Sequence, residues 1–163
     1  MNVDATIQQT PISDRHTQLG ARLIEFGGWL MPVQYSGILE EHRAVRERAG
    51  LFDLSHMGEL FVEGAEAGDA LARALVTDPP SLAVGRAHYS MICQPDGGVI
   101  DDLIVYRLGE ERFLVVANAA NATVVSDELA SRLGRWRAVL DDRSLATSLV
   151  AIRVRAPPRS SRR

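Results

Sequence analysis

Two adjacent acids interrupt an apolar run in the second half of the chain. Asp101 and Asp102 lie within residues 99–106, where every other residue is Val, Ile, Leu or Tyr. Because side chains alternate along a strand, Asp102 would share one face with Ile104 and Tyr106, and Asp101 would lie on the other. A buried carboxylate needs matching donors or a bound ligand. Spacing leaves two readings open: a buried, matched acid that could serve chemistry, or an exposed pair at the start of a strand.

The other residues that could do chemistry lack the spacing of a known site. His16, His42, His56 and His88 are scattered, and none stands at metal-ligand spacing such as H-x-x-x-H, so we interpret each as structural and expect no metal. The single Cys93 excludes an internal disulfide and has no zinc-type neighbours; we interpret it as a small buried residue. No G-x-S-x-G, P-loop or G-x-G-x-x-G occurs, so hydrolase, nucleotide-triphosphate and dinucleotide functions have no support.

Composition places the chain among globular proteins. Its 163 residues are 46% hydrophobic and 24% charged, which is enough for an ordinary domain with a core. No apolar run approaches the roughly 20 residues that cross a bilayer, and the first nine residues do not resemble a signal peptide. We therefore expect a cytoplasmic protein without a membrane partner.

Charge is unevenly distributed along the chain. Residues 153–163 carry five arginines and no acid, whereas the rest has 13 basic and 21 acidic side chains. The basic end lacks aromatic residues and any binding motif, so we interpret it as a disordered tail and predict no nucleic-acid partner. All 18 basic side chains are arginine.

The elements that must position the two acids can be read from the hydrophobic pattern. Residues 10–37 mix glycines and prolines with aromatic residues and are expected to form an irregular, packed lead-in. Helices are predicted over 38–49, 65–77 and 123–133, and strands over 58–62, 87–93, 99–107, 113–117, 136–140 and 149–154. Ser36 and Gly50 are expected to cap the first helix, and Asn118 or Asn121 the last. From residue 58 onward this order predicts an α+β domain whose antiparallel-rich sheet has helices on one face.

Several sequence blocks together resemble the aminomethyltransferase of the glycine cleavage system, its T protein. The blocks are T-P-I (10–12), G-A-R (20–22), F-G-G-W-L-M-P-V-Q-Y (26–35), E-H-R-A-V-R (41–46), G-L-F-D-L-S-H-M-G-E (50–59) and G-G-V-I-D-D-L-I-V-Y (97–106). They follow the family's order and spacing from Thr10 to about Ile152. The resemblance implies that the aminomethyl group on the lipoyl arm of the H protein passes to the co-substrate tetrahydrofolate, giving 5,10-methylenetetrahydrofolate and ammonia.

The resemblance also implies a site and a domain plan. Asp102 matches the family's carboxylate that faces the reacting part of the folate. The positions that match other folate contacts are Met57, Tyr89, Ile104, Tyr106 and Asn118. Residues 51–145 match a ferredoxin-like domain, and residues 1–50 with a return strand at 146–152 match part of an incomplete second, folate-binding domain.

The chain departs from the family after about Ile152. The family continues with a Gly-Pro pair and a long further segment, whereas residues 153–163 form an Arg/Pro/Ser run that matches nothing in it. We therefore expect an N-terminal portion of the family, truncated or frameshifted at this point. Two alternatives to a transferase stay open: a folate-binding protein without transferase activity, and a non-functional fragment.

Overall fold

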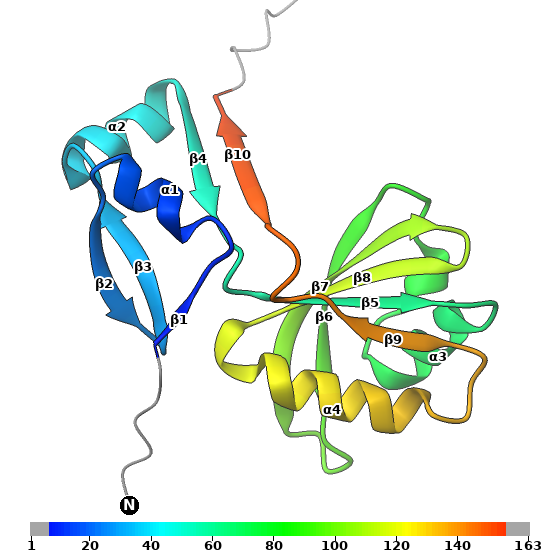
Figure 1. Cartoon of the computed structure of the whole chain (residues 1–163). Coiled ribbons are helices and arrows are strands. Elements are labelled where there is room, and N and C mark those ends of the chain that lie inside the picture. Colours follow the sequence, from blue (N-terminus) through cyan, green and yellow to red (C-terminus); the bar gives the residue numbers. More distant parts are fainter. Residues whose placement is uncertain (1–6, 156–163) are drawn as a thin grey trace, which may run out of the picture. The chain divides into compact units, whose positions relative to one another are not determined.

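The computed structural model describes residues 7–155, which divide into two compact units (Figure 1). One unit comprises residues 57–147, and the other comprises the residues up to His56 together with those from Ser148 onward. The predicted α+β class with antiparallel-rich sheets is confirmed. No helix in the described part is long and apolar enough to cross a membrane.

The unit of residues 57–147 is built on a five-stranded sheet of order β6-β7-β8-β5-β9, in which all neighbours are antiparallel. Its elements are β5 (Gly58–Glu63), α3 (Ala67–Ala74), η1 (Pro79–Ser81), β6 (Ala87–Cys93), β7 (Val99–Gly109), β8 (Arg112–Ala117), η2 (Ala119–Asn121), α4 (Ala122–Leu133) and β9 (Val139–Asp142). The path β5-α3-β7-β8-α4-β9 gives the βαββαβ order of a ferredoxin-like fold, and β6 adds an edge strand next to β7. The predicted sequence of strand, helix, three strands, helix and strand is therefore confirmed.

Alternation gives this sheet one apolar face, which packs against both helices. Leu103 and Val105 of β7 are buried beside Leu71 of α3 and Leu129 of α4. β5, β6 and β8 contribute buried side chains to the same cluster: Leu60, Val62, Ile92, Phe113, Val115 and Ala117. Each large apolar side chain buried in this way contributes about 1.5–3 kcal/mol, so both helices of this unit pack on this one face of the sheet.

The lead-in of residues 10–37 was predicted to be irregular, and that prediction is wrong. The segment holds regular elements: β1 (Gln8–Gln9) lies before it, and α1 (Ser13–Gln18), β2 (Arg22–Phe26) and β3 (Trp29–Gln34) lie within it. β2 and β3 form a hairpin closed by Gly27 and Gly28, which have φ values of 59° and 83°. Two consecutive positive φ values suit the tight turn of a hairpin, and glycine adopts them without strain. The Gly-Gly pair was therefore a strand-turn-strand signal.

The first predicted helix ends earlier than expected and is capped differently. α2 spans Ile38–Glu47, and β4 (Ala49–Asp53) begins where the helix was expected to end. The N-cap is Gly37 and not Ser36; the Glu41 carboxylate accepts hydrogen bonds from the backbone N–H groups of Tyr35 and Gly37 at 2.7 and 3.0 Å. These bonds hold the pKa of Glu41 below its ordinary value. Gly50 lies inside β4 and caps no helix.

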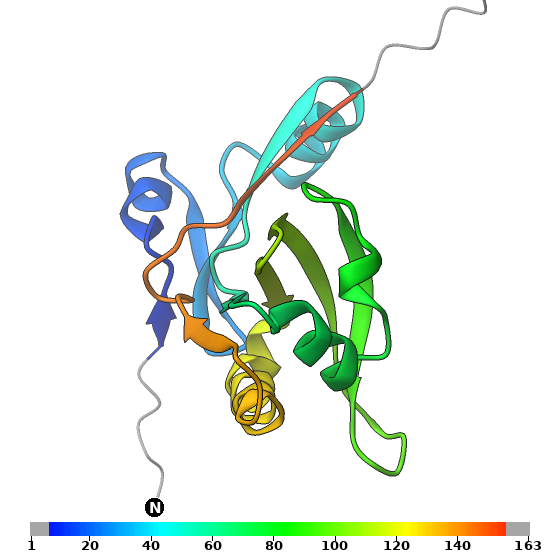
Figure 2. The same ribbon diagram turned by 90° about the vertical axis from the view of Figure 1, so that its right-hand side faces the viewer.

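β10 (Val150–Val154) pairs antiparallel with β4, and Figure 2 shows the two strands running side by side. Arg153 lies opposite Gly50, and the backbone N–H of Arg155 donates to the Arg48 carbonyl at 3.0 Å. The expectation of a disordered tail is therefore wrong for residues 153–155. Residues 156–163 lie outside the described part of the chain.

Candidate functional site

Asp101 is the buried member of the acidic pair and is fully matched. Its side chain lies on the helix-covered side of β7 and is 3% exposed. Oδ2 accepts the backbone N–H of Asn118 at 2.9 Å, and Oδ1 accepts the side-chain amides of Asn118 and Asn121 at 3.0 and 2.7 Å. Asn121 is the N-cap residue of α4, one of the two expected positions, but it makes no side-chain capping bond because its amide binds this carboxylate. Asp101 therefore connects the segment after β8 to β7 through hydrogen bonds.

Asp102 lies on the opposite face of β7 and is exposed. Its carboxylate accepts a hydrogen bond from the Tyr89 hydroxyl of β6 and one from the Asn118 side-chain amide at 3.2 Å. The same amide donates to the Asp102 backbone carbonyl at 2.9 Å. Within residues 7–155 no cation pairs with Asp102, so its negative charge is held in place by neutral donors and stays available to a cation or an N–H donor.

The other expected site residues differ in how closely the sheet places them to the Asp102 carboxylate. Ile104 pairs with Tyr89 across β6 and β7, and both lie on the face of Asp102. Tyr106 lies two residues further along the same face, opposite Leu114 of β8. Met57 directly precedes Gly58, whose partner Ala117 directly precedes Asn118, so Met57 and Asn118 lie at the same end of neighbouring strands. Tyr89 and Asn118 each contact Asp102 directly. For Met57, Ile104 and Tyr106 the register shows only a shared region.

The face around Asp102 is apolar and open. Tyr89 is 63% exposed and Met91, opposite Asp102 on β6, is 37% exposed. Ile104, Tyr106 and Leu114 are half-buried. A flat planar ligand could lie on this surface with a polar nitrogen directed at Asp102, since aromatic and aliphatic side chains bind ring faces and a fixed carboxylate binds N–H groups.

A comparison with protein-family models identifies the family to which these elements belong. The family model described as the GCVT N-terminal domain matches residues 12–157, which include all of the expected site residues. The chain belongs to this family. The expected resemblance is confirmed, although the family match runs a few residues beyond Ile152.

Aminomethyltransferases of other organisms are similar over almost the whole chain. An aminomethyltransferase of Saccharopolyspora erythraea is 55% identical over 145 residues, covering 89% of this chain and 40% of that protein. An aminomethyltransferase of Streptomyces avermitilis is 52% identical over 145 residues, with 89% and 39% covered. The chain thus spans about 40% of the length of these relatives.

A solved structure of the same family has the same fold. The glycine cleavage system aminomethyltransferase T from Bartonella henselae is 38% identical, with a TM-score of 0.84 over 90% of this chain and 40% of that one. The predicted correspondence to an N-terminal portion of the GCVT family agrees with these coverages.

A second polar cluster within the GCVT match was not foreseen from the sequence. His16 of α1 lies between Asp53 of β4 and Tyr35: Nε2 is 2.8 Å from Asp53 Oδ2, and Nδ1 is 2.8 Å from the Tyr35 hydroxyl oxygen. The Thr10 hydroxyl donates to the same Asp53 oxygen at 2.8 Å, and the Ser55 backbone N–H donates to Oδ1 at 2.9 Å. The side chains of His16 and Asp53 are 7% and 1% exposed. The interpretation of His16 as structural agrees with this geometry.

The hydrogen bonds of this cluster lower the pKa of Asp53. Burial alone would raise the pKa of this carboxyl, but the hydrogen bonds from Ser55, His16 and Thr10 together hold its pKa below the ordinary value. Tyr35 has a raised pKa because of burial and the negative charges of Asp53 and Glu41. The tyrosine is therefore a neutral donor or acceptor for His16, and the cluster joins α1 to β4 through a buried anion.

Proposed function

We propose that this chain is the N-terminal portion of the aminomethyltransferase of the glycine cleavage system. In the proposed reaction the aminomethyl group on the lipoyl arm of the H protein passes to tetrahydrofolate, with release of ammonia, in the cytoplasm. The single observation that supports this proposal is the exposed Asp102 carboxylate, held by Tyr89 and Asn118 on an apolar sheet face within the family match.

The proposed work of Asp102 follows from charge. Transfer of the one-carbon unit to a folate nitrogen passes through a positively charged iminium as ammonia leaves, and a fixed anion lowers the energy of that charge. Because Tyr89 and Asn118 already hold the carboxylate, little reorganisation is required when the charge develops. Ile104 and Tyr106 would contact the apolar body of the folate, and Met57 would border the site at the start of β5.

Binding of tetrahydrofolate to this chain tests the proposal directly. Isothermal titration calorimetry should show binding by the wild type, and Asp102→Asn should weaken it by about tenfold or more, since a charge-assisted hydrogen bond contributes roughly 1.5–3 kcal/mol. Asp127→Asn, which removes an exposed acid from α4, is the matched control and should leave binding unchanged. Equal affinities of the wild type and Asp102→Asn would reject the assigned role.

Dependence on the H protein separates transfer from binding alone. Ammonia release from aminomethyl-lipoyl H protein, measured with and without the chain, should rise only when both the chain and tetrahydrofolate are present. Folate binding without this release would instead favour a folate-binding protein that does not transfer. Absence of folate binding in a cooperatively unfolding chain would reject both proposals.

A further inference from the structure

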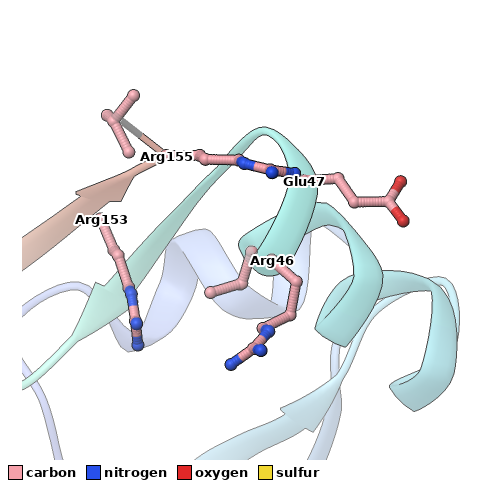
Figure 3. A pocket seen from close by; sticks show the side chains of 6 residues that line it. Arg46, Glu47, Arg153 and Arg155 are labelled. Carbon is pink, nitrogen blue, oxygen red and sulfur yellow. The ribbon is translucent and has the colours of Figure 1, made fainter. Parts of the chain in front are cut away.

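Three arginines line a cleft on the unit that contains α2 and β10, far along the sequence from the acidic strand face. The cleft has a volume of about 540 Å³ and is lined by Val45, Arg46, Glu47, Arg153, Val154 and Arg155 (Figure 3). Arg46 comes from the last turn of α2, whereas Arg153 lies near the end of β10 and Arg155 directly follows that strand. The cleft therefore joins two segments that are more than a hundred residues apart in the sequence.

These guanidinium groups have no partners in the described part of the chain. None of the three takes part in an ion pair or a side-chain hydrogen bond among residues 7–155, whereas other arginines, such as Arg107 and Arg132, bind carboxylates and backbone carbonyls. Arg153 is in β10 and Arg155 follows its last residue; in Figure 3 the two side chains run in different directions. In Figure 3 the Arg46 and Arg153 side chains point the same way, and the Glu47 carboxylate points away from both. Three cations thus stand around one cleft with one acid on its rim.

This arrangement needs an explanation beyond helix electrostatics. A cation near the C-terminus of a helix is stabilised by the helix dipole, which accounts for Arg46. It does not account for Arg153 in β10 or for Arg155 directly after it. Neighbouring like charges repel, and a bound anion removes that repulsion. Because the chain has no lysine, every one of these cations is a planar, bidentate donor suited to oxyanions.

We propose that the cleft binds a small polyvalent oxyanion, one that presents two or more phosphate or carboxylate groups. Arg46 and Arg153 hold one group from two sides, Arg155 holds a second, and Val45 contributes apolar lining beside Arg46. The site is independent of Asp102 and of the proposed transfer reaction. A monovalent anion would leave part of the charge unmatched, so polyvalent ligands bind more tightly than monovalent ones.

Calorimetric titration of the full chain at low salt with pyrophosphate and, separately, with citrate tests the proposal. Binding of either ligand is expected, and the preferred ligand tells whether phosphate or carboxylate is the favoured group. Arg153→Gln with Arg155→Gln should weaken binding by about tenfold or more, and Arg46→Gln alone by a smaller factor. Arg153→Lys with Arg155→Lys should also weaken it several-fold, because lysine keeps the charge but loses the bidentate geometry.

Two controls distinguish the cleft from general positive charge. Arg22→Gln with Arg86→Gln removes two other exposed arginines without ion pairs in the described residues and should leave affinity within about twofold. Replacing Arg159, Arg162 and Arg163 by glutamine should do the same. No binding of either ligand by the wild type, or an equal loss in a control variant, would overturn the assignment. Circular dichroism and urea unfolding of every variant establish that it is folded.

Discussion

Asparagine substitutions at Asp101 and at Asp102, made one at a time, distinguish a structural acid from a proposed functional acid at adjacent positions. The two substitutions are chemically identical and occur in the same strand. Asp101 is buried and accepts three hydrogen bonds, whereas Asp102 is exposed and keeps a neutral acceptor after substitution. We expect Asp101→Asn to destabilise the unit of residues 57–147 and Asp102→Asn to leave its stability nearly unchanged.

The magnitude follows from the donors around Asp101. Oδ1 accepts two hydrogen bonds and Oδ2 accepts one. An asparagine in its best orientation keeps the two bonds to its oxygen and turns its own N–H groups toward the Asn118 backbone N–H, so one bond is lost and the other two lose their charge. Hydrogen bonds to charged groups contribute about 1.5–3 kcal/mol and neutral ones about 0.5–1.5 kcal/mol, so losing one charged bond and weakening two others gives an expected loss of about 3.5–6 kcal/mol. For the exposed Asp102 it is under about 1 kcal/mol.

Urea unfolding followed by the fluorescence of Trp136 measures this difference. The chain has two tryptophans, and Trp29 belongs to the other unit, so a Trp29→Phe background leaves only Trp136, which packs against the core of residues 57–147. The denaturation midpoint should fall for Asp101→Asn at unchanged slope and stay constant for Asp102→Asn. If Asp102→Asn cost as much as Asp101→Asn, the division of roles between the two faces of β7 would be refuted.

Two further perturbations test the remaining polar contacts. Asp53→Asn should cost about 2–4 kcal/mol at neutral pH, because it removes a buried anion from His16 and Thr10. Since the folded-state pKa of Asp53 is lowered, its stabilisation is present above the unfolded pKa of about 3.9 and is lost as pH falls through the lower, folded value. The wild type should therefore lose its advantage over the variant as the pH falls below about 4. The fluorescence of Trp29 reports this loss, and Asp14→Asn is the exposed control. Arg132→Met should lower the free energy of unfolding by about 1–3 kcal/mol in urea unfolding followed by Trp136, because the guanidinium donates to the carbonyls of Ala74 and Cys93 at 2.9 and 2.8 Å. Arg73→Met, which removes an exposed arginine from α3, is the control and should change stability little. A larger loss for Arg73→Met than for Arg132→Met would contradict the stabilising role of the Arg132 hydrogen bonds.

Periodicity predicted the unit of residues 57–147 well, since its strands alternate and its helices have apolar faces. It failed where tertiary contacts decide local structure. The helix predicted to Ala49 ends at Glu47 because β4 pairs with β10, about a hundred residues later in the chain. Likewise, alternation places Asp101 and Asp102 on opposite faces but cannot tell which face is covered. The donors that answer this question, Asn118 and Asn121, follow β8, where the sequence pattern predicts only a helix cap.

The buried cluster in the other unit was missed for a related reason. Asp53, His16 and Thr10 lie in separate elements, and no spacing along the chain reveals that they meet. Cys93 was expected to be buried and is partly exposed near the end of an edge strand, because β6 has only one neighbour. Such features depend on which strands form edges, and this is settled only by the assembled sheet.

Asn118 explains why the structural and the proposed functional carboxylates stand side by side. Its backbone and side-chain N–H groups bind Asp101, and the same side-chain amide donates to the backbone carbonyl and the carboxylate of Asp102. Two amide hydrogens are thus shared among three acceptors, which restricts both aspartates to one arrangement. The buried acid holds Asn118, and Asn118 in turn orients the exposed acid. An exposed carboxylate on a strand would otherwise sample several rotamers, and a fixed one loses less entropy when a ligand binds. On this reasoning Asp101 is a positioning residue for Asp102, and the D-D pair is a single unit that spans both faces of the sheet.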